Sequence, residues 1–258
     1  MQTDLYNYLS TLERLKNDNV SSSASIANEM INCSLALFKD DRLKNKILDI
    51  IEAQSSMAMV INVGFRILEA VDSNSFETLK SLKEEILEFS NKAIKDAANF
   101  LKGVKNIATI SYSKTVYDTL LLIKPERVYL SVAHPAKEGE MLANRLCKDN
   151  IDAVLFEDSS YSLVMKDVDC VLVGADAIFD NTFVNKTGTF SLALLAREFQ
   201  VPFYVVSCAC KYLDSKKRAL FKIKDAPKTE VSDSSCFVIN RYFEEVPIKF
   251  VNKMFLGR

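Results

Sequence analysis

The chain changes its hydrophobic pattern near residue 105. Before this point apolar residues recur at intervals of three and four positions, which predicts amphipathic helices. Beyond it, short apolar runs rich in β-branched and aromatic residues alternate with helical patterns, which is typical of a parallel sheet covered on both faces. We therefore expect an α/β protein, with a helical-bundle N-terminal domain over residues 1–104 and a Rossmann-like parallel-sheet domain over residues 105–258.

The helical pattern of the first part is clearest over residues 74–101, where Asn74 and Glu77 resemble a capping box and Gly103 is placed to end the helix. The serine-rich run over residues 21–25 is placed to cap an earlier helix. Residues 42–68 predict a further long helical stretch that Gly64 can interrupt. Together these patterns indicate an antiparallel bundle.

The second part contains six candidate strands. They cover residues 107–110, 128–132, 153–156, 170–174, 203–206 and 237–239. Helices are predicted over residues 114–122, 138–148, 189–199 and 247–255. In an open parallel sheet, ligands bind beyond the carboxyl ends of the strands, so the residues directly after each strand are the candidates for chemistry.

Charge and hydropathy exclude several classes of protein. The 33 Lys and Arg against 34 Asp and Glu give a net charge of −1, which disfavours direct nucleic-acid binding and polybasic membrane binding. No apolar stretch reaches the ~18 residues of a membrane span. The first residues show no cationic region followed by an apolar run, so we expect no signal peptide and a cytoplasmic protein.

Cysteine, histidine and glycine usage narrows the chemistry. The six cysteines contain no C-x-x-C pair, and we expect reduced core thiols. A single histidine, His134, disfavours a metal site, and we expect no metal and no cofactor. The six glycines fit neither the dinucleotide fingerprint nor the P-loop. A phosphate would therefore have to bind helix N-termini and Lys or Arg.

Two of the segments that follow strands carry hydroxyl and imidazole groups. Ser111 and Ser113 precede a helix, where they can hold an anion or serve as N-caps. His134 follows the second strand, as a catalytic group or as a structural histidine.

Two further segments pair a carboxylate with a cation. Asp176 directly follows a buried strand, as a general acid or base or as a turn aspartate. Asn185 and Lys186 precede a helix, as a phosphate site or as a solvated lysine before a capped helix. If the sheet is as predicted, Asp176 and Lys186 meet at one crevice, which suggests a phosphorylated ligand beside a carboxylate.

These residues also carry a family resemblance. VLVGADAI at 171–178, VNKTGT at 184–189, VPFYVV at 201–206 and the N-x-x-F-[DE]-x-x-P pattern at 240–247 resemble the initiation factor 2B superfamily. That superfamily joins the α, β and δ subunits of the factor with ribose-1,5-bisphosphate isomerase and methylthioribose-1-phosphate isomerase. The resemblance implies a sugar-phosphate crevice between the domains and dimers, in some members hexamers, formed through the C-terminal domain.

The resemblance also implies residue roles. The isomerases use a cysteine opposite the aspartate that matches Asp176, and an Asn-Lys pair that matches Asn185 and Lys186. Here Ser111 occupies the cysteine position, and His134 replaces the arginine of an R-P segment. No R-G-A-type motif occurs in the N-terminal part.

These departures favour a regulatory protein that binds a sugar phosphate or nucleotide through Ser113, His134, Asn185 and Lys186, without efficient turnover. An isomerase is the alternative, with Asp176 moving the proton between C1 and C2 and with His134 or Ser111 replacing the thiol. A third interpretation is an assembly module with a vestigial crevice.

Overall fold

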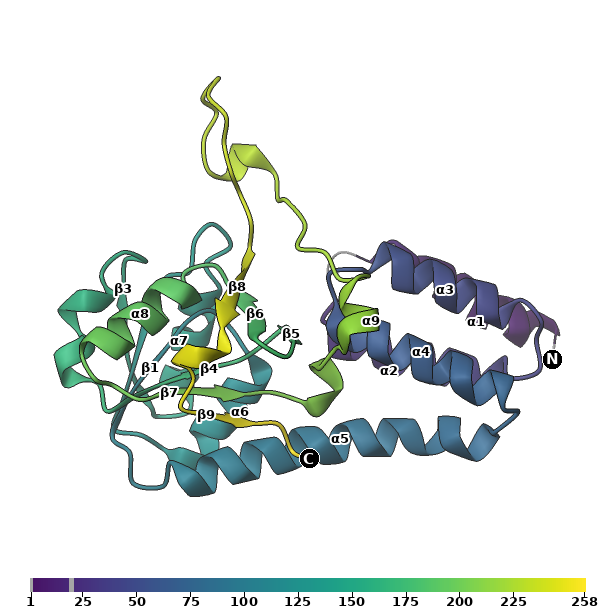
Figure 1. Cartoon of the computed structure of the whole chain (residues 1–258), viewed down its shortest axis with the longest axis horizontal. Coiled ribbons are helices and arrows are strands. Elements are labelled where there is room, and N and C mark those ends of the chain that lie inside the picture. The colour runs from purple at the N-terminus through teal and green to yellow at the C-terminus, as the bar shows by residue number, and fades with distance from the viewer. Residues whose placement is uncertain (1, 19–20) are drawn as a thin grey trace. The chain divides into compact units, whose positions relative to one another are not determined.

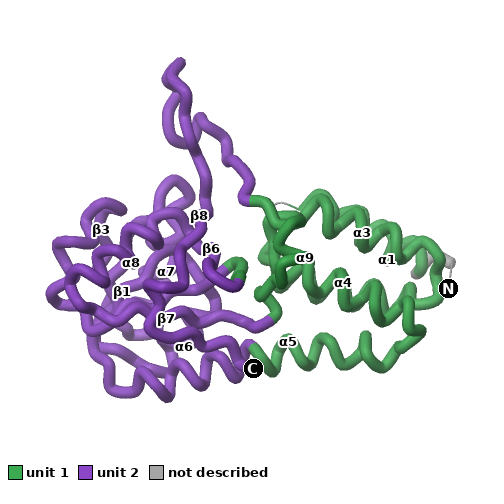
Figure 2. The backbone as a smooth tube through the Cα atoms, viewed as in Figure 1, with its two compact units in different colours: residues 1–89, 176–179, 210–222 green, residues 90–175, 180–209, 223–258 purple. Residues whose placement is uncertain are grey.

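The computed structural model describes residues 2–18 and 21–258 (Figure 1). Its contacts divide the chain into two compact units (Figure 2). Unit 1 comprises residues 1–89, 176–179 and 210–222, and unit 2 comprises residues 90–175, 180–209 and 223–258. The domain boundary after residue 104 stays a prediction.

Unit 1 is built from helices. They are α1 (Gln2–Lys16), α2 (Ser23–Ala36), α3 (Leu43–Ala53), α4 (Ala58–Asp72) and the first part of α5 (Phe76–Phe100). Leu12, Ile26, Met30, Ile47 and Ile61 are fully buried between them. Each such side chain contributes ~1.5–3 kcal/mol of hydrophobic free energy. The predicted helical N-terminal region is confirmed.

The start of α2 agrees with the prediction from the sequence, whereas the position of the break between α3 and α4 differs from it. The Ser22 hydroxyl accepts a hydrogen bond from the Ser25 N–H at 3.2 Å and caps α2. The predicted interruption at Gly64 is wrong, because the helices break after Ala53. Gly64 lies inside α4, where an added Cβ would come within 2.5 Å of Ile51. Its role is therefore close helix packing.

The ends of α5 also differ in part from expectation. The capping box at Asn74 is wrong: α5 begins at Phe76, and Asn74 has a φ of 50°. The Asn74 amide oxygen instead accepts a hydrogen bond from Lys39 Nζ at 2.5 Å. Gly103 follows the end of α5 with a φ of 86°, as its placement predicts.

Two short segments complete unit 1. The strand β5 (Ala177–Ile178) is joined to residues 210–222 by the Leu213 N–H, which donates to the Ile178 carbonyl at 2.9 Å. The short helix α9 (Ser215–Arg218) follows, capped by Asp214. The Asn62 amide of α4 donates to the Cys210 carbonyl at 2.8 Å, which ties these segments to the bundle.

Unit 2 contains the predicted parallel sheet, with six strands in the order β3-β2-β1-β4-β7-β9. The strands are β1 (Asn106–Thr109), β2 (Arg127–Ser131), β3 (Asp152–Phe156), β4 (Cys170–Val173), β7 (Phe203–Val206) and β9 (Lys253–Phe255). Its helices are α6 (Lys114–Ile123), α7 (Glu138–Lys148) and α8 (Thr189–Glu198). Ile107 of β1 pairs with Val128 of β2 and Cys170 of β4. The strand order therefore reverses between β1 and β4.

The last part of unit 2 departs from the prediction. Residues 237–239 form no strand, and Phe237 is 92% exposed. Residues 247–255 form no helix, because a short 3-10 turn (Ile248–Phe250) leads into β9. An antiparallel pair, β6 (Thr182–Lys186) with β8 (Phe243–Pro247), was not predicted. Further 3-10 turns cover Tyr161–Leu163, Met165–Asp167, Ala209–Lys211 and Lys228–Glu230.

The cysteines are of two kinds. Cys33, Cys147, Cys170 and Cys236 are free thiols. The expectation of reduced thiols is wrong for Cys208 and Cys210, which are disulfide-bonded.

Candidate functional site

The carboxyl edge of the sheet between β1 and β4 gathers several predicted site residues. Ser111 and Ser113 follow β1, and Gly174 follows β4. A Cβ added to Gly174 would lie 2.7 Å from Ser113 Oγ and 3.9 Å from Asn185 Oδ1. Ser113 and Asn185 therefore both face Gly174, at the end of the strand where the strand order reverses.

The two serines have different local roles. Ser113 is the N-cap of α6, and its hydroxyl accepts from the Val116 N–H at 3.4 Å. Ser111 has a φ of 62°, in the left-handed region that favours glycine. Non-glycine residues in this region concentrate at functional sites, where the surrounding structure holds them. The binding role of both residues stays a prediction.

Asn185 is fixed in β6 with its amide oxygen toward Gly174. Its Nδ2 donates to Thr189 Oγ1 at 3.0 Å, and Thr189 Oγ1 donates in turn to the Lys186 carbonyl at 2.6 Å. The residue is 6% exposed. This network holds Asn185 in one orientation through its amide nitrogen, and the amide oxygen, an acceptor, faces Gly174.

Lys186 has a counter-ion that the sequence did not reveal. Its Nζ donates to both carboxylate oxygens of Glu138 at 2.9 Å, and the Tyr242 ring lies 5.1 Å from the ammonium group. The Lys186 side chain is only 4% exposed. The interpretation as a solvated lysine is therefore wrong, and any ligand of Lys186 competes with Glu138.

The N-terminus of α8 is also occupied by a carboxylate of the chain. Glu244 Oε1 accepts hydrogen bonds from the Gly188 N–H at 2.7 Å and the Phe190 N–H at 2.9 Å. Free N–H groups and the helix dipole make such a terminus attractive to anions. Here the acidic residue of the 240–247 motif supplies that anion.

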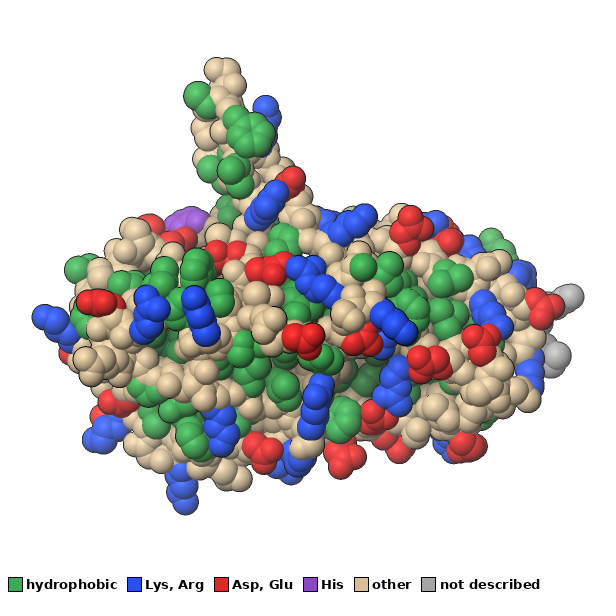
Figure 3. Space-filling model, in the orientation of Figure 1, with side chains coloured by type: hydrophobic (Ala, Val, Ile, Leu, Met, Phe, Trp, Pro, Cys, Tyr) green, Lys and Arg blue, Asp and Glu red, His purple; other side chains and the backbone are tan. Residues whose placement is uncertain are grey.

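His134 is held by a carboxylate from the loop after β3. Its Nδ1 lies 3.1 Å from Asp158 Oδ2, and the Ala133 and His134 N–H groups donate to the same carboxylate at 2.7 and 2.8 Å. Burial raises the pKa of Asp158, but the hydrogen bonds outweigh it and hold the pKa below its usual value. The His134 side chain itself is 44% exposed (Figure 3).

Tyr161 joins β1 to β2 beside these residues. Its hydroxyl donates to the Thr109 carbonyl at 2.8 Å and lies 3.2 Å from Ser131 Oγ, inside the protein. Burial raises the pKa of Tyr161 well above its ordinary value. This tyrosine fixes the ends of the two strands, and no sequence motif pointed to it.

Asp176 belongs to unit 1, whereas Lys186 and Asn185 belong to unit 2. Asp176 Oδ1 lies 3.7 Å from Lys211 Nζ, with the Asp176 side chain 39% exposed. The convergence of Asp176 and Lys186 at one crevice stays a prediction.

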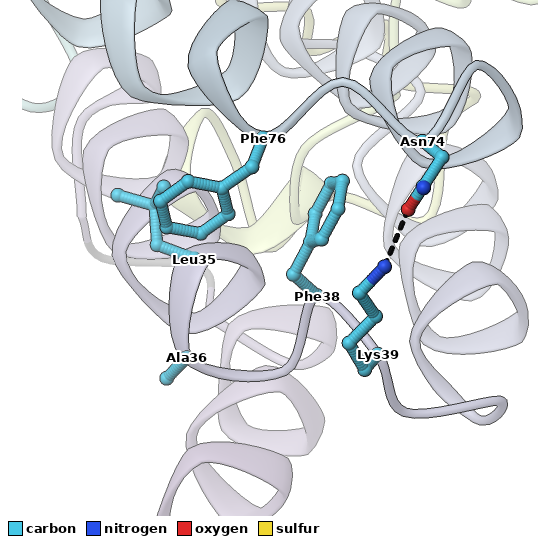
Figure 4. A pocket seen from close by; sticks show the side chains of 6 residues that line it. All are labelled: Leu35, Ala36, Phe38, Lys39, Asn74 and Phe76. Carbon is cyan, nitrogen blue, oxygen red and sulfur yellow. Dashed lines mark hydrogen bonds between the residues drawn. The ribbon is translucent and has the colours of Figure 1, made fainter.

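A surface cavity of about 310 Å³ lies elsewhere, in the helical unit (Figure 4). Its lining consists of Leu35, Ala36, Phe38, Lys39, Asn74 and Phe76. Lys39 and Asn74 are hydrogen-bonded to each other across it. It contains none of the predicted site residues.

Residues 2–18 and 21–258, the part of the chain that the structure describes, show neither a metal cluster nor a membrane-spanning helix. Nowhere in them do three or more His, Cys, Asp or Glu side chains cluster closely enough to hold a metal ion. In this described part of the chain, no helix has the length and hydropathy needed to cross a membrane.

Comparison with known proteins gives two kinds of relative. The chain is 27% identical over 256 residues to a protein of Pyrococcus furiosus described as translation initiation factor eIF-2B subunit 2-like, covering 93% of this chain and 91% of the relative. It is 36% identical over 148 residues to ribose 1,5-bisphosphate isomerase of Methanocaldococcus jannaschii, covering 57% of this chain. The matched region spans 47% of that isomerase, about half its length.

Solved structures share the fold. A translation initiation factor eIF-2B of Pyrococcus horikoshii OT3 superimposes with a TM-score of 0.76 at 24% identity, covering 97% of this chain and 95% of the other. The 5-methylthioribose 1-phosphate isomerase of the same organism gives 0.77 at 20% identity, with 97% and 83% covered. The expected fold class is confirmed. Residues 8–254 match the model of the Initiation factor 2 subunit family, and the chain therefore belongs to that family.

Proposed function

We propose that this chain is an initiation factor 2B subunit-like cytoplasmic protein that binds a phosphorylated sugar or nucleotide and has no efficient isomerase activity. The convergence of Ser113 and Asn185 over Gly174 supports this most directly. It lies where the strand order reverses, which is where open α/β sheets bind ligands. The absence of a side chain at Gly174 makes room for Ser113, whose Oγ would lie 2.7 Å from an added Cβ.

The residue at the thiol position argues against turnover. Ser111 stands where the isomerases that this chain resembles place a cysteine. A serine hydroxyl is a much weaker acid than a thiol, and none of the described hydrogen bonds joins the Ser111 side chain to a base. Because an acid or base partner contributes ~10²–10⁴ in rate, its loss leaves binding without useful catalysis.

Thermal unfolding with ribose 1,5-bisphosphate, methylthioribose 1-phosphate and AMP tests the proposal. A ligand present at 100 times its dissociation constant stabilises the native state by ~2.7 kcal/mol, and Asn185→Leu should abolish the shift. Absence of any shift would leave only the assembly-module interpretation. Robust turnover of either sugar phosphate, abolished by Asp176→Asn, would contradict the regulatory role.

The isomerase alternative has one observation in its favour. The imidazole of His134 is oriented by Asp158 at 3.1 Å, an arrangement that suits a general acid or base. In this alternative Asp176 moves the proton between C1 and C2 while His134 serves the ring oxygen. If this alternative holds, the pH–rate profile should contain a step from the titration of an imidazole. The isomerase activity should be lost in His134→Ala.

We further propose that the chain forms a homodimer through its C-terminal domain. Residues 223–242 form an arm of unit 2 that carries exposed apolar side chains (Figures 2 and 3). Apolar groups gathered on an exposed segment mark an interaction surface.

A further inference from the structure

The Lys186–Glu138 pair bears on which ligands this site accepts. Both carboxylate oxygens of Glu138 lie 2.9 Å from Lys186 Nζ, and the ammonium group is almost fully buried. An unpaired buried ammonium group is strongly disfavoured. Glu138 and Lys186 therefore hold each other unless another anion takes the place of Glu138.

The position of Glu138 allows another anion to take its place beside Lys186. It is the first residue of α7, directly after Lys137 at a φ of 57°, and its side chain remains 27% exposed. Its described side-chain hydrogen bonds all go to Lys186. Rotation of this side chain into solvent would release Lys186 and break no backbone hydrogen bond.

The second carboxylate in the region is not replaceable in this way. Glu244 lies within β8, opposite Asn185 in the β6–β8 ladder, and it binds the main-chain N–H groups of Gly188 and Phe190. Its displacement would uncap α8. An incoming anion is therefore directed to Lys186 rather than to the helix N-terminus.

Charge decides which anion displaces Glu138. A carboxylate ligand has the same charge and geometry as Glu138, so the exchange gains nothing. A phosphate monoester carries a charge of about −1.5 to −2 at pH 7 and three strong acceptor oxygens, so it binds the ammonium group more strongly than Glu138 does. A neutral hydroxyl group cannot replace the lost ion pair.

We propose that Glu138 is a specificity-determining residue: by competing for Lys186, it admits phosphate monoesters and excludes carboxylates and neutral sugars. The inference rests on the proposed function, because it takes Lys186 as a ligand-binding residue.

Isothermal titration with ribose 5-phosphate, ribonate and ribose tests this. The wild-type protein should bind ribose 5-phosphate and show no measurable affinity for ribonate. Glu138→Gln should bind ribose 5-phosphate about tenfold more tightly and should gain measurable ribonate binding, since ~1.4 kcal/mol less competition is tenfold in affinity. Glu140→Gln, in the same first turn of α7, is the matched control and should behave as wild type.

The outcomes separate the two proposals. If Glu138→Gln binds ribose 5-phosphate but discriminates against ribonate as strongly as wild type, the role of Glu138 is overturned while the binding function stands. If no variant binds ribose 5-phosphate, the inference fails, and the screen with ribose 1,5-bisphosphate and AMP decides the binding function separately. Because Gln retains an amide oxygen that accepts from Lys186 but not the negative charge, the variant should unfold at a lower midpoint than wild type, and ribose 5-phosphate should raise that midpoint. Lys186→Met should abolish binding in both backgrounds.

Discussion

At the scale of single residues, burial separates the free thiols by reactivity. Burial raises the pKa of the Cys170 thiol to about 12, whereas Cys147 is exposed. The thiolate is the reactive form, so at pH 8 we expect iodoacetamide to alkylate Cys147 and to leave Cys170 unmodified in the native protein. Mass spectrometry of the peptides measures this. Equal labelling of both in the native state would contradict it, and unfolding in urea should make Cys170 reactive.

Asp158 gives a prediction for the acid side of the stability curve. Its pKa is held below the usual 3.8 in the folded protein, so its stabilising effect is complete above that value and is lost as the pH falls through the lower, folded-state pKa. In denaturant titrations below about pH 4, the free energy of unfolding should fall more steeply for wild type than for Asp158→Asn. Asp233→Asn, at an exposed loop position, should follow wild type. Parallel curves for wild type and Asp158→Asn would refute the assignment.

The sequence showed the polar residues of the site more readily than their partners. Asn185 and Lys186 could be singled out because they lie between a strand and a helix. Glu138 and Glu244 lie 48 and 56 residues from the groups they bind, Lys186 and the Gly188 N–H. Such pairs depend on which strand ends the fold brings together, and no local spacing signals them. The single signal available was the acidic position of the 240–247 motif.

At the scale of elements, the α8 cap can be tested directly. Glu244→Ala removes the acceptor for two N–H groups at a helix N-terminus, which should cost ~1–2 kcal/mol in the free energy of unfolding. Glu245→Ala, the next residue of β8, loses an exposed hydrogen bond to Thr182 and should cost well under 1 kcal/mol. Urea denaturation compares the two. Equal losses would mean that Glu244 does not act as the cap.

The start of α7 depends on close approach to β2. A Cβ added to Gly139 would lie 1.8 Å from the Ser131 carbonyl oxygen, so Gly139→Ala should destabilise the protein by ~1–3 kcal/mol. At Gly103 an added Cβ meets nothing within 4 Å and only the positive φ opposes it, so Gly103→Ala should cost ~1 kcal/mol or less. Unfolding midpoints in urea decide the order. A fully tolerated Gly139→Ala would show that α7 can move away from the sheet.

Helices and strands could be predicted where the spacing of apolar residues repeats over a long segment, but not near the C-terminal end of the chain. The helices over 114–122 and 138–148 were anticipated because their apolar spacing matches one buried face. Residues 237–239 have strand-like composition but no partner strand, and Phe237 faces solvent. Conversely, β9 is a strand of three residues, and each of them pairs with a residue of β7 that lies 49 positions earlier in the chain. Three residues carry too little periodicity to identify a strand.

At the scale of the whole molecule, the arm at residues 223–242 leads to a prediction about assembly. The base of the arm is ordered, because Asn240 Nδ2 donates to the Pro227 carbonyl at 2.8 Å and to Glu230 Oε2 at 2.9 Å. Yet Phe237 is 92% and Ile239 71% exposed in the same arm. Apolar side chains that an ordered segment holds in water mark a surface that a partner covers. In a symmetric dimer, the arms of both copies would be covered at once.

Light scattering should therefore give a mass of about twice the 29.1 kDa of the chain. The double variant Phe237→Ser, Ile239→Ser should shift the protein toward the single-chain mass without changing its unfolding midpoint at low concentration, since both side chains are already exposed in one copy. Leu48→Ser removes an exposed apolar group from α3 of unit 1 and should leave the dimer intact. A double variant that stays dimeric would place the contact elsewhere on the chain.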